Sequence, residues 1–273
     1  MELSALLREV IVITRKAGAA VMAIYDSSDF GVETKGDDSP LTKADLAANQ
    51  IIVNSLSSLP DKFPILSEES KQIPYEVRRH WHTFWLVDPL DGTKEFIKRN
   101  GEFTVNIALI HDGAPILGVV YAPAINRLYY AANGQKAHVQ EGDTNPKPLQ
   151  VADYRGQRLK VVASRSHAGP ALQGFLGRLG DFEVVSMGSS LKLCLVAEGK
   201  AHIYPRLGPT MEWDTAAAHA VVMMGGGQVT DLEGESLHYN KEDLLNSHFI
   251  VTGNPPYPWR DCLVRNAIAK PQR

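Results

Sequence analysis

The 273 residues can form one large domain or two of ordinary size, and 44% hydrophobic with 22% charged residues is typical of a soluble globular protein. A net charge of -3 argues against a general nucleic-acid or anionic-membrane binder. Charged residues interrupt the apolar stretch 3–24, so it predicts neither a membrane span nor a signal peptide. Cys194 and Cys262 lie far apart, which excludes a disulfide framework or a zinc site. We expect a cytoplasmic protein; peripheral contact with the inner membrane face and the oligomeric state stay open.

Two helices are predicted near the start of the chain. Apolar residues recur at helical spacing from Leu3 to Tyr25, which indicates an amphipathic helix. A second helix is expected from about Lys43 to Ser58, ending before Pro60. Asp45 lies in its first turn, where a carboxylate is an ordinary helix cap, so a functional role for Asp45 stays open at this point.

Acidic residues follow two short apolar strands. The strand that begins at Pro64 is followed by Glu68 and Glu69, which also fit a solvated acidic turn. The run Phe84–Val87 is expected to end abruptly at Asp88. Ligands bind beyond strand ends in open sheets, so two neighbouring strands would bring these acids together.

The second of these acids belongs to the sequence Asp88-Pro89-Leu90-Asp91-Gly92-Thr93. Proline and glycine predict a tight turn with both aspartates on one side. Two carboxylates 4 Å apart repel by about 4 kcal/mol at an effective dielectric of about 20, so a cation between them is one interpretation. An Asx-type turn without a metal is the other. The backbone N–H groups of Gly92 and Thr93 could hold a phosphate at the start of a helical segment.

The rest of the chain changes its pattern near residue 150. An antiparallel meander is predicted first, with strands at 103–111, 116–121, 127–131 and 137–140 and hairpin turns at Asp112-Gly113 and Asn133-Gly134. The polar segment 141–156 then separates residues 1–150 from residues 151–273. The second half alternates strands at 159–163, 182–186, 201–204 and 228–230 with helices at 170–179, 191–197 and 212–224. The fold class is therefore α/β, with α+β layering.

A further acid, Asp214, opens the helix predicted at 212–224. By itself it is a favourable charge at a helix N-terminus. The alanines that follow it allow close packing, which would bring this end of the helix toward the strand ends. No dinucleotide-binding or Walker-type glycine loop is present, so nucleotide binding by those loops is excluded.

Taken together, Glu68-Glu69, the turn from Asp88 to Thr93, and Trp213-Asp214 resemble the inositol monophosphatase superfamily of metal-dependent, lithium-sensitive phosphatases. The resemblance covers nearly the whole chain to about Thr252. It implies the layered sandwich of that family, with an N-terminal antiparallel sheet plus helices and a C-terminal α/β half. The segments 94–103, 164–167 and 188–192 are similar to bisphosphate nucleotidases of the CysQ type, which remove the 3'-phosphate of adenosine 3',5'-bisphosphate, a by-product of sulfate activation.

The resemblance also implies roles for individual residues. An all-oxygen ligand set suits Mg²⁺, and two or three ions are expected. The implied ligands are Glu68, Asp88, the Leu90 carbonyl, Asp91 and Asp214, with Asp88 shared between two ions. Glu68, Asp45 and Thr93 are the implied catalytic residues, the latter two orienting and deprotonating water.

The substrate side of the site is implied in the same way. The expected contacts to the phosphorylated nucleotide are Gly92, Thr93, Ser164, His167, Gly188, Ser190, Lys192, Arg206 and Asp214. Lys192 and Arg206 would neutralise the second phosphate. For His167 alone, an ordinary polar loop residue is the alternative.

Three functions stay open on the sequence. The first is the bisphosphate nucleotidase; the second is an inositol or sugar phosphate phosphatase of the same superfamily. The third is a non-catalytic nucleotide- or metal-binding sensor. The pairing of Asp45 with Thr93 speaks against the third, because a binder does not need a water-activating pair.

Overall fold

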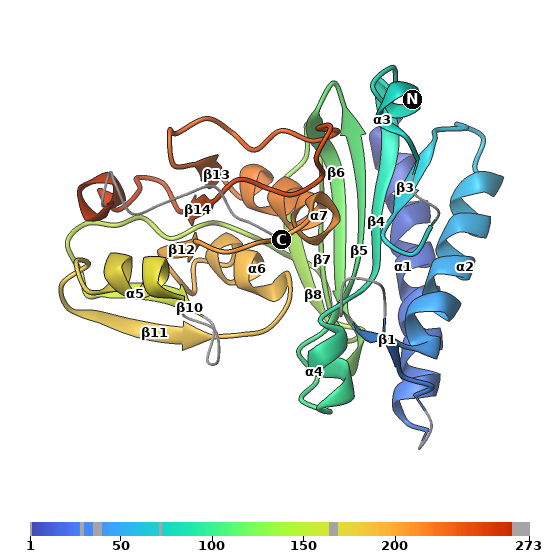
Figure 1. Cartoon of the computed structure of the whole chain (residues 1–273), viewed down its shortest axis with the longest axis horizontal. Helices are drawn as coiled ribbons and strands as arrows, with labels where there is room; N and C mark the ends of the chain where they lie inside the picture. The colour runs from blue at the N-terminus through green and yellow to red at the C-terminus, as the bar shows by residue number, and fades with distance from the viewer. Residues whose placement is uncertain (1, 28–29, 35–39, 71–72, 164–168, 264–273) are drawn as a thin grey trace.

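The computed structural model describes residues 2–27, 30–34, 40–70, 73–163 and 169–263. Helices and sheets alternate in layers across the molecule (Figure 1). Helices α1 (Leu3–Tyr25) and α2 (Lys43–Ser58) cover the outer face of a large sheet, and α6 (Leu191–Ala197) and α7 (Glu212–Met224) cover its inner face. A smaller sheet follows, with α5 (Pro170–Leu176) and the 3-10 helix η2 (Trp259–Cys262) on its far side. The layered sandwich predicted from the sequence is confirmed.

The large sheet has seven strands in the order β3-β4-β5-β6-β7-β8-β9. Their bounds are β3 Ile65–Ser67, β4 Thr83–Asp91, β5 Thr104–His111, β6 Ala114–Ala122, β7 Arg127–Ala132, β8 His138–Glu141 and β9 Lys147–Pro148. Strands β3 and β4 run parallel, and every later neighbour is antiparallel. The hairpin turn predicted at Asp112-Gly113 joins β5 to β6, because both residues adopt the positive φ that such a turn requires.

Period-two alternation in these strands supplies both faces of the large sheet. Trp85 and Val87 of β4, with Ile107 of β5, pack against α1 and α2. The alternate residues Phe84 and Leu86 face α6 and α7. The helix at 3–25 and the helix at 43–58 have the bounds predicted from the sequence. Smaller elements are β1 (Glu33–Thr34), β2 (Pro40–Leu41), α3 (Tyr75–Arg78), α4 (Thr93–Ile97) and the 3-10 helix η1 (Pro123–Ile125).

The smaller sheet has the strand order β11-β10-β12-β14-β13. Its strands are β10 Leu159–Ala163, β11 Phe182–Ser186, β12 Ile203–Arg206, β13 Gln228–Asp231 and β14 Phe249–Thr252. Strands β10, β11 and β12 are parallel, whereas β14 is antiparallel to both of its neighbours. Strand β14 was not among the strands predicted from the sequence; it pairs with β13, the strand before it in the chain, and with β12. Helix α5 also ends earlier than predicted, at Leu176.

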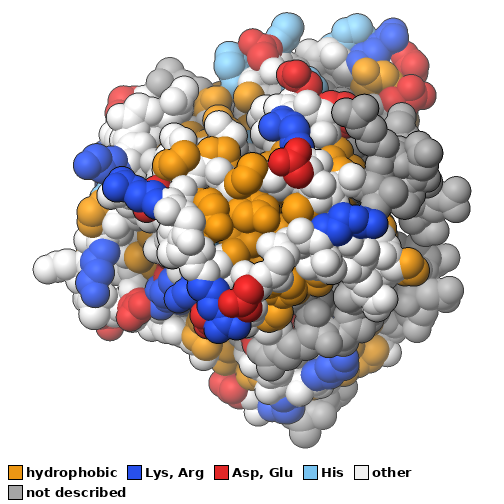
Figure 2. Space-filling view, turned by 90° about the vertical axis from the view of Figure 1, so that its left-hand side faces the viewer, with side chains coloured by type: hydrophobic (Ala, Val, Ile, Leu, Met, Phe, Trp, Pro, Cys, Tyr) orange, Lys and Arg blue, Asp and Glu red, His pale blue; other side chains and the backbone are white. Residues whose placement is uncertain are grey.

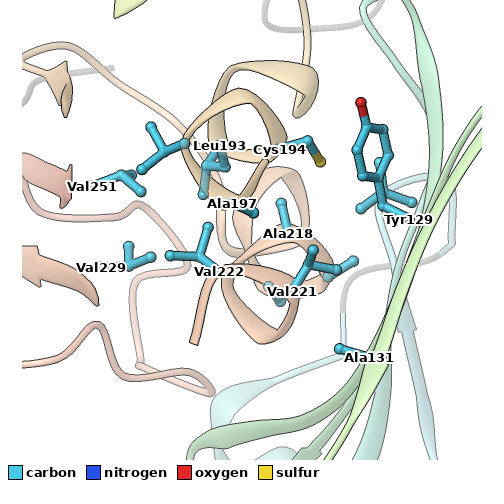
Figure 3. Close-up of a cluster of buried hydrophobic side chains, with 14 of the residues drawn as sticks. Tyr129, Ala131, Leu193, Cys194, Ala197, Ala218, Val221, Val222, Val229 and Val251 are labelled. Atoms are coloured by element: carbon cyan, nitrogen blue, oxygen red, sulfur yellow. The ribbon is translucent and has the colours of Figure 1, made fainter. Parts of the chain in front are cut away.

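One hydrophobic cluster joins the two sheets through α6 and α7. Figure 3 shows Val221 and Val222 of α7 between Tyr129 and Ala131 of the large sheet and Val229 and Val251 of the small sheet. All six side chains are buried. We infer that the predicted halves, 1–150 and 151–273, fold around a shared core.

The helix at the centre packs very closely on the large sheet. A Cβ atom built at Gly118 of β6 would lie 2.2 Å from the Ala217 carbonyl oxygen and 2.8 Å from the Ala220 Cβ. The run of alanines in α7 and this glycine therefore set the distance between helix and sheet. The close packing expected from the small residues after Asp214 is confirmed.

The surface on the side of α5 and β11 carries both apolar and charged side chains. Figure 2 shows hydrophobic side chains at the centre of that face, with Lys and Arg interspersed with Asp and Glu around them. In the described part of the chain, no helix combines the length and the apolar composition that a membrane crossing requires.

The close approach of α7 to β6 predicts the effect of one added methyl group. We expect Gly118→Ala to lower the free energy of unfolding by about 1–3 kcal/mol, because the backbone of α7 must move. Denaturant unfolding measures the change. The control is Gly174→Ala in α5, where the nearest atom would be 3.6 Å away and alanine is expected to be neutral or stabilising. Equal stability of Gly118→Ala and wild type would show that α7 is not held at this distance.

Candidate metal and phosphate site

Parallel pairing of β3 and β4 places the first two acids side by side. Ser67 pairs with Val87, and the Glu68 N–H donates a 3.1 Å hydrogen bond to the Val87 carbonyl oxygen. Glu68 therefore lies beside Asp88 at the same edge of the sheet. The prediction that two neighbouring strands bring Glu68 and Asp88 together is confirmed, although β4 does not end at Asp88.

The turn predicted after Asp88 is wrong. Strand β4 continues to Asp91, with Asp88 opposite Asn106 and Asp91 opposite Thr104 on β5, and the register shifts between them. Pro89 fits within an extended strand at this shift because its missing N–H falls where the ladder is already interrupted. The Leu90 N–H instead donates to Asp88 Oδ1 at 3.0 Å.

The register shift decides where the two carboxylates point. Residues three apart in a regular strand face opposite sides of the sheet. Here the three steps from Asp88 to Asp91 match only two steps from Thr104 to Asn106, so β4 contains one extra residue. The bulge thus returns Asp88 and Asp91 to the same face.

The third acid comes from the N-terminus of α7. Asp214 Oδ2 accepts a 2.9 Å hydrogen bond from the Met211 N–H, as in a capping box. Glu212, whose side chain is fully buried, accepts from the N–H groups of Asn240 (2.6 Å) and Lys241 (3.0 Å) and pairs with Lys241 Nζ at 2.5 Å. These contacts and the close packing at Gly118 fix the start of the helix beside the sheet edge.

Glu68, Asp88 and Asp214 converge on one point. One carboxylate oxygen from each lies within 4.8 Å of the others. Burial raises the pKa of Asp88 well above its ordinary value, and the charges of Glu68, Asp91 and Asp214 raise it further. Desolvation and the neighbouring carboxylates, Asp91 first, raise the pKa of Asp214 as well. Three hard oxygen donors that repel one another fit a cation such as Mg²⁺.

Asp91 stands beside this group but is held differently. Its Oδ2 accepts hydrogen bonds from Ser189 Oγ (2.7 Å), the Ser190 N–H (2.6 Å) and Ser190 Oγ (2.5 Å). With Oδ2 occupied in this way, Oδ1 is the oxygen that can face a cation. The predicted substrate contact Ser190 thus directs its amide to Asp91, and its hydroxyl lies within hydrogen-bond distance of Asp91 and of the Asp214 carbonyl oxygen.

The structure brings Asp45 and Thr93 together across more than forty residues of sequence. Thr93 Oγ1 lies 3.3 Å from Asp45 Oδ1 and 3.3 Å from the Leu90 carbonyl oxygen. Asp45 Oδ2 accepts from the N–H of Thr42 at 2.8 Å and from its hydroxyl at 2.6 Å. Asp45 is therefore a helix cap and a partner of Thr93 at the same time.

A cavity of about 1100 Å³ opens over these residues. Its lining includes all the predicted metal ligands together with two predicted phosphate contacts, namely Glu68, Asp88, Leu90, Asp91 and Asp214 with Gly92 and Thr93. Gly92 adopts φ of 93° at the start of α4, a left-handed conformation that favours glycine. An aromatic side chain, Trp213, and the exposed Lys94 border the same cavity.

The remaining described residues predicted to contact the substrate are not part of the lining of this cavity. Lys192 and Arg206 border a separate hollow of about 30 Å³, and Arg206 Nη2 donates to the Pro209 carbonyl oxygen at 2.6 Å. The charge of Arg206 lowers the pKa of Asp214 slightly against the larger opposing effects. Gly188 packs against Glu102 and Glu95, where a Cβ would come within 2.8 Å of the Glu102 carbonyl oxygen. Ser164 and His167 lie outside the described residues.

Sequence reasoning missed the residues behind Asp91. Thr104 Oγ1 lies 2.7 Å from Ser189 Oγ, and Asn106 Nδ2 donates to Ser190 Oγ at 2.8 Å. The signal was present in the alternation of β5, where Val105 and Ile107 are apolar and Thr104 and Asn106 between them are polar. Two polar residues on one face of a strand predict a polar neighbour on that face.

Comparisons with known proteins agree with this geometry. The model of the Inositol monophosphatase family matches residues 3–267. The chain is 51% identical over 249 residues to the 3'(2'),5'-bisphosphate nucleotidase CysQ of Salmonella typhimurium, covering 90% of this chain and 99% of the relative. It is 52% identical to the corresponding protein of Escherichia coli strain K12, with the same coverage of 90% and 99%.

A solved structure has the same overall fold. The crystal structure of CysQ from Bacteroides thetaiotaomicron, described as a bacterial member of the inositol monophosphatase family, aligns with a TM-score of 0.82 and 46% identity. The alignment covers 91% of this chain and 97% of that one. The chain therefore belongs to the inositol monophosphatase family.

Proposed function

We propose that the protein is a Mg²⁺-dependent 3'(2'),5'-bisphosphate nucleotidase that removes the 3'-phosphate of adenosine 3',5'-bisphosphate and releases AMP and phosphate. The convergence of Glu68, Asp88 and Asp214 beside Asp91 carries the proposal. The relatives that are about half identical over 90% of the chain bear the name of this activity. Such a substrate arises from sulfate activation, which places the reaction in sulfur metabolism.

Different residues would bind the metal ions and transfer the proton during hydrolysis of the phosphate ester. Glu68, Asp88, Asp91, Asp214 and the Leu90 carbonyl would hold two or three Mg²⁺ ions. When bound, these ions would polarise the phosphate and lower the pKa of water. Asp45 Oδ1 lies 3.3 Å from Thr93 Oγ1, so this carboxylate can take a proton through the threonine hydroxyl.

The other residues hold the substrate. The Gly92 and Thr93 N–H groups would bind the reacting phosphate at the start of α4. Lys192 and Arg206, which share one hollow, would neutralise the second phosphate, with Gly188, Ser190, Ser164 and His167 on the nucleotide side. This assignment rests on the family resemblance and on the position of the basic pair beside the acidic cluster.

Substrate choice separates the possible activities. We expect Mg²⁺-dependent phosphate release to be strongest with adenosine 3',5'-bisphosphate, weaker with inositol 1-phosphate and fructose 1,6-bisphosphate, and inhibited by lithium. A colorimetric phosphate assay with and without chelator measures this. Equal turnover of the three compounds would favour a general phosphomonoesterase of the family. Release of no phosphate from any compound would leave a binding protein, and release unchanged by chelator would contradict the metal mechanism.

The position of Lys192 in the hollow that it shares with Arg206 predicts a selective loss of activity on the bisphosphate. We expect Lys192→Ala to reduce kcat/KM for the bisphosphate by roughly 10- to 100-fold, because a hydrogen bond to a charged group contributes about 1.5–3 kcal/mol. Activity on a monophosphate should change far less. Steady-state kinetics on both substrates, with Lys147→Ala on exposed β9 as the control, decide the assignment. Equal losses on both substrates would place Lys192 elsewhere.

The raised pKa of Asp88 predicts how charge and stability are linked. A raised pKa means that the protonated carboxyl is favoured in the folded protein. The contribution of Asp88 to the stability of the metal-free protein should then be fully present below the ordinary aspartate pKa and be lost as pH rises through the raised value. Asp88→Asn should accordingly make the metal-free protein more stable at neutral pH, while activity falls by at least about 100-fold, since even outer-shell changes cost about 10- to 100-fold.

Thermal unfolding in chelator and in Mg²⁺ tests this linkage. Mg²⁺ should stabilise the wild type by mass action and Asp88→Asn much less. Asp112→Asn is the control, because hydrogen bonding to His82 lowers the pKa of that exposed carboxyl and its removal should give no gain in stability. A metal-free Asp88→Asn protein that is less stable than wild type, yet equally stabilised by Mg²⁺, would remove Asp88 from the ligand set.

A further inference from the structure

Two buried side chains of β5 lie directly opposite the aspartates of β4. Thr104 is 0% exposed and pairs with Asp91, and Asn106 is 1% exposed and pairs with Asp88. Neither has a part in the mechanism above. Each instead contacts a serine of the loop before α6.

The hydrogen bond from Asn106 limits the acceptors to which the Ser190 hydroxyl can donate. Its Nδ2 can only donate, so Ser190 Oγ accepts that bond at 2.8 Å. The hydroxyl hydrogen of Ser190 is then available to Asp91 Oδ2 at 2.5 Å or to the Asp214 carbonyl oxygen at 2.7 Å. Both acceptors belong to residues of the acidic group.

Thr104 directs a second hydroxyl in the same way. Ser189 Oγ lies 2.7 Å from Asp91 Oδ2, and a carboxylate can only accept, so the hydrogen of Ser189 points at Asp91. Thr104 Oγ1, 2.7 Å from the same Ser189 oxygen, must then be the donor to it. The chain from Thr104 thus ends on Asp91 Oδ2, and the chain from Asn106 ends on the same oxygen or on the Asp214 carbonyl oxygen; in each chain one bond polarises the next.

Two further observations show that this arrangement is not ordinary core packing. Asn106 Oδ1 is buried without a hydrogen-bond partner among the described residues, which an apolar side chain here would avoid. Ser189 adopts φ of 54°, an uncommon conformation for a residue with a side chain. The polar pair on β5 therefore holds a strained loop against Asp91.

We propose that Thr104 and Asn106 are positioning residues that, through Ser189 and Ser190, hold Asp91 with Oδ1 turned toward the cation. The inference rests on the proposed metal-dependent function and assigns residues outside the ligand set. Outer-shell partners of metal-ligating carboxylates typically change metal affinity by about 10- to 100-fold when removed.

The test removes one hydroxyl without changing its shape. Thr104→Val deletes the donor, and Thr104→Ser restores it. Thr14→Val is the matched control, because Thr14 is equally buried and its hydroxyl donates to the Val10 carbonyl oxygen within α1, away from the acids. Asn106→Ala tests the second chain of hydrogen-bond donors, through Ser190, and it provides the test of the proposal if Thr104→Val does not fold. The readouts are thermal unfolding titrated with Mg²⁺ alone and the Mg²⁺ dependence of phosphate release.

The positioning role predicts a shift in Mg²⁺ dependence. Thr104→Val and Asn106→Ala should raise the Mg²⁺ concentration for half-maximal stabilisation by about 10-fold or more, and activity should recover at saturating Mg²⁺. Thr104→Ser and Thr14→Val should keep the wild-type midpoint. Unchanged midpoints in Thr104→Val and Asn106→Ala, with a normal response of the wild type, would overturn this inference alone. A wild type that Mg²⁺ does not stabilise would overturn the proposed function as well.

Discussion

The structure depends on holding carboxylates close together against their mutual repulsion. Glu68, Asp88 and Asp214 place oxygens within 4.8 Å of one another, and Asp91 adds its charge to the same region. Folding energy from elsewhere must oppose this repulsion in the metal-free protein. The shared core between the two sheets is the source of that energy, because α7 carries Asp214 and also contributes Val221 and Val222 to the core.

Each acid is supported by a different structural device. Parallel pairing with β4 fixes Glu68, a one-residue bulge turns Asp91 to the face of Asp88, and close packing at Gly118 sets the position of α7. A strand, a bulge and a helix N-terminus all have defined geometry, so the carboxylates cannot move apart without disrupting backbone hydrogen bonds. The repulsion among these carboxylates therefore persists in the metal-free protein, and a bound cation would relieve it.

The site has an acidic side and a basic side. The acids and Thr93, which is bonded to Asp45, line the large cavity, whereas Lys192 and Arg206 border a separate small hollow. Ser189 and Ser190 lie between the two sides, since they contact Asp91 and begin the helix that contains Lys192. In the function proposed above, the two phosphates of the substrate would bind one at each side.

The sequence by itself determined most of the helices and strands and which acidic residues were candidates for the site. Helical spacing located α1, the stop before Pro60 located the end of α2, and alternation located the meander. The residues from Asp88 to Thr93 with Trp213-Asp214 indicated the family. Only the tertiary structure decided how Asp88 and Asp91 face one way, because the bulge depends on pairing with β5, distant in the sequence. It alone paired Asp45 with Thr93 and linked Thr104 and Asn106 to Asp91 through Ser189 and Ser190. The physical reason is that local patterns set backbone conformation, whereas contacts between distant side chains exist only once the layers have packed.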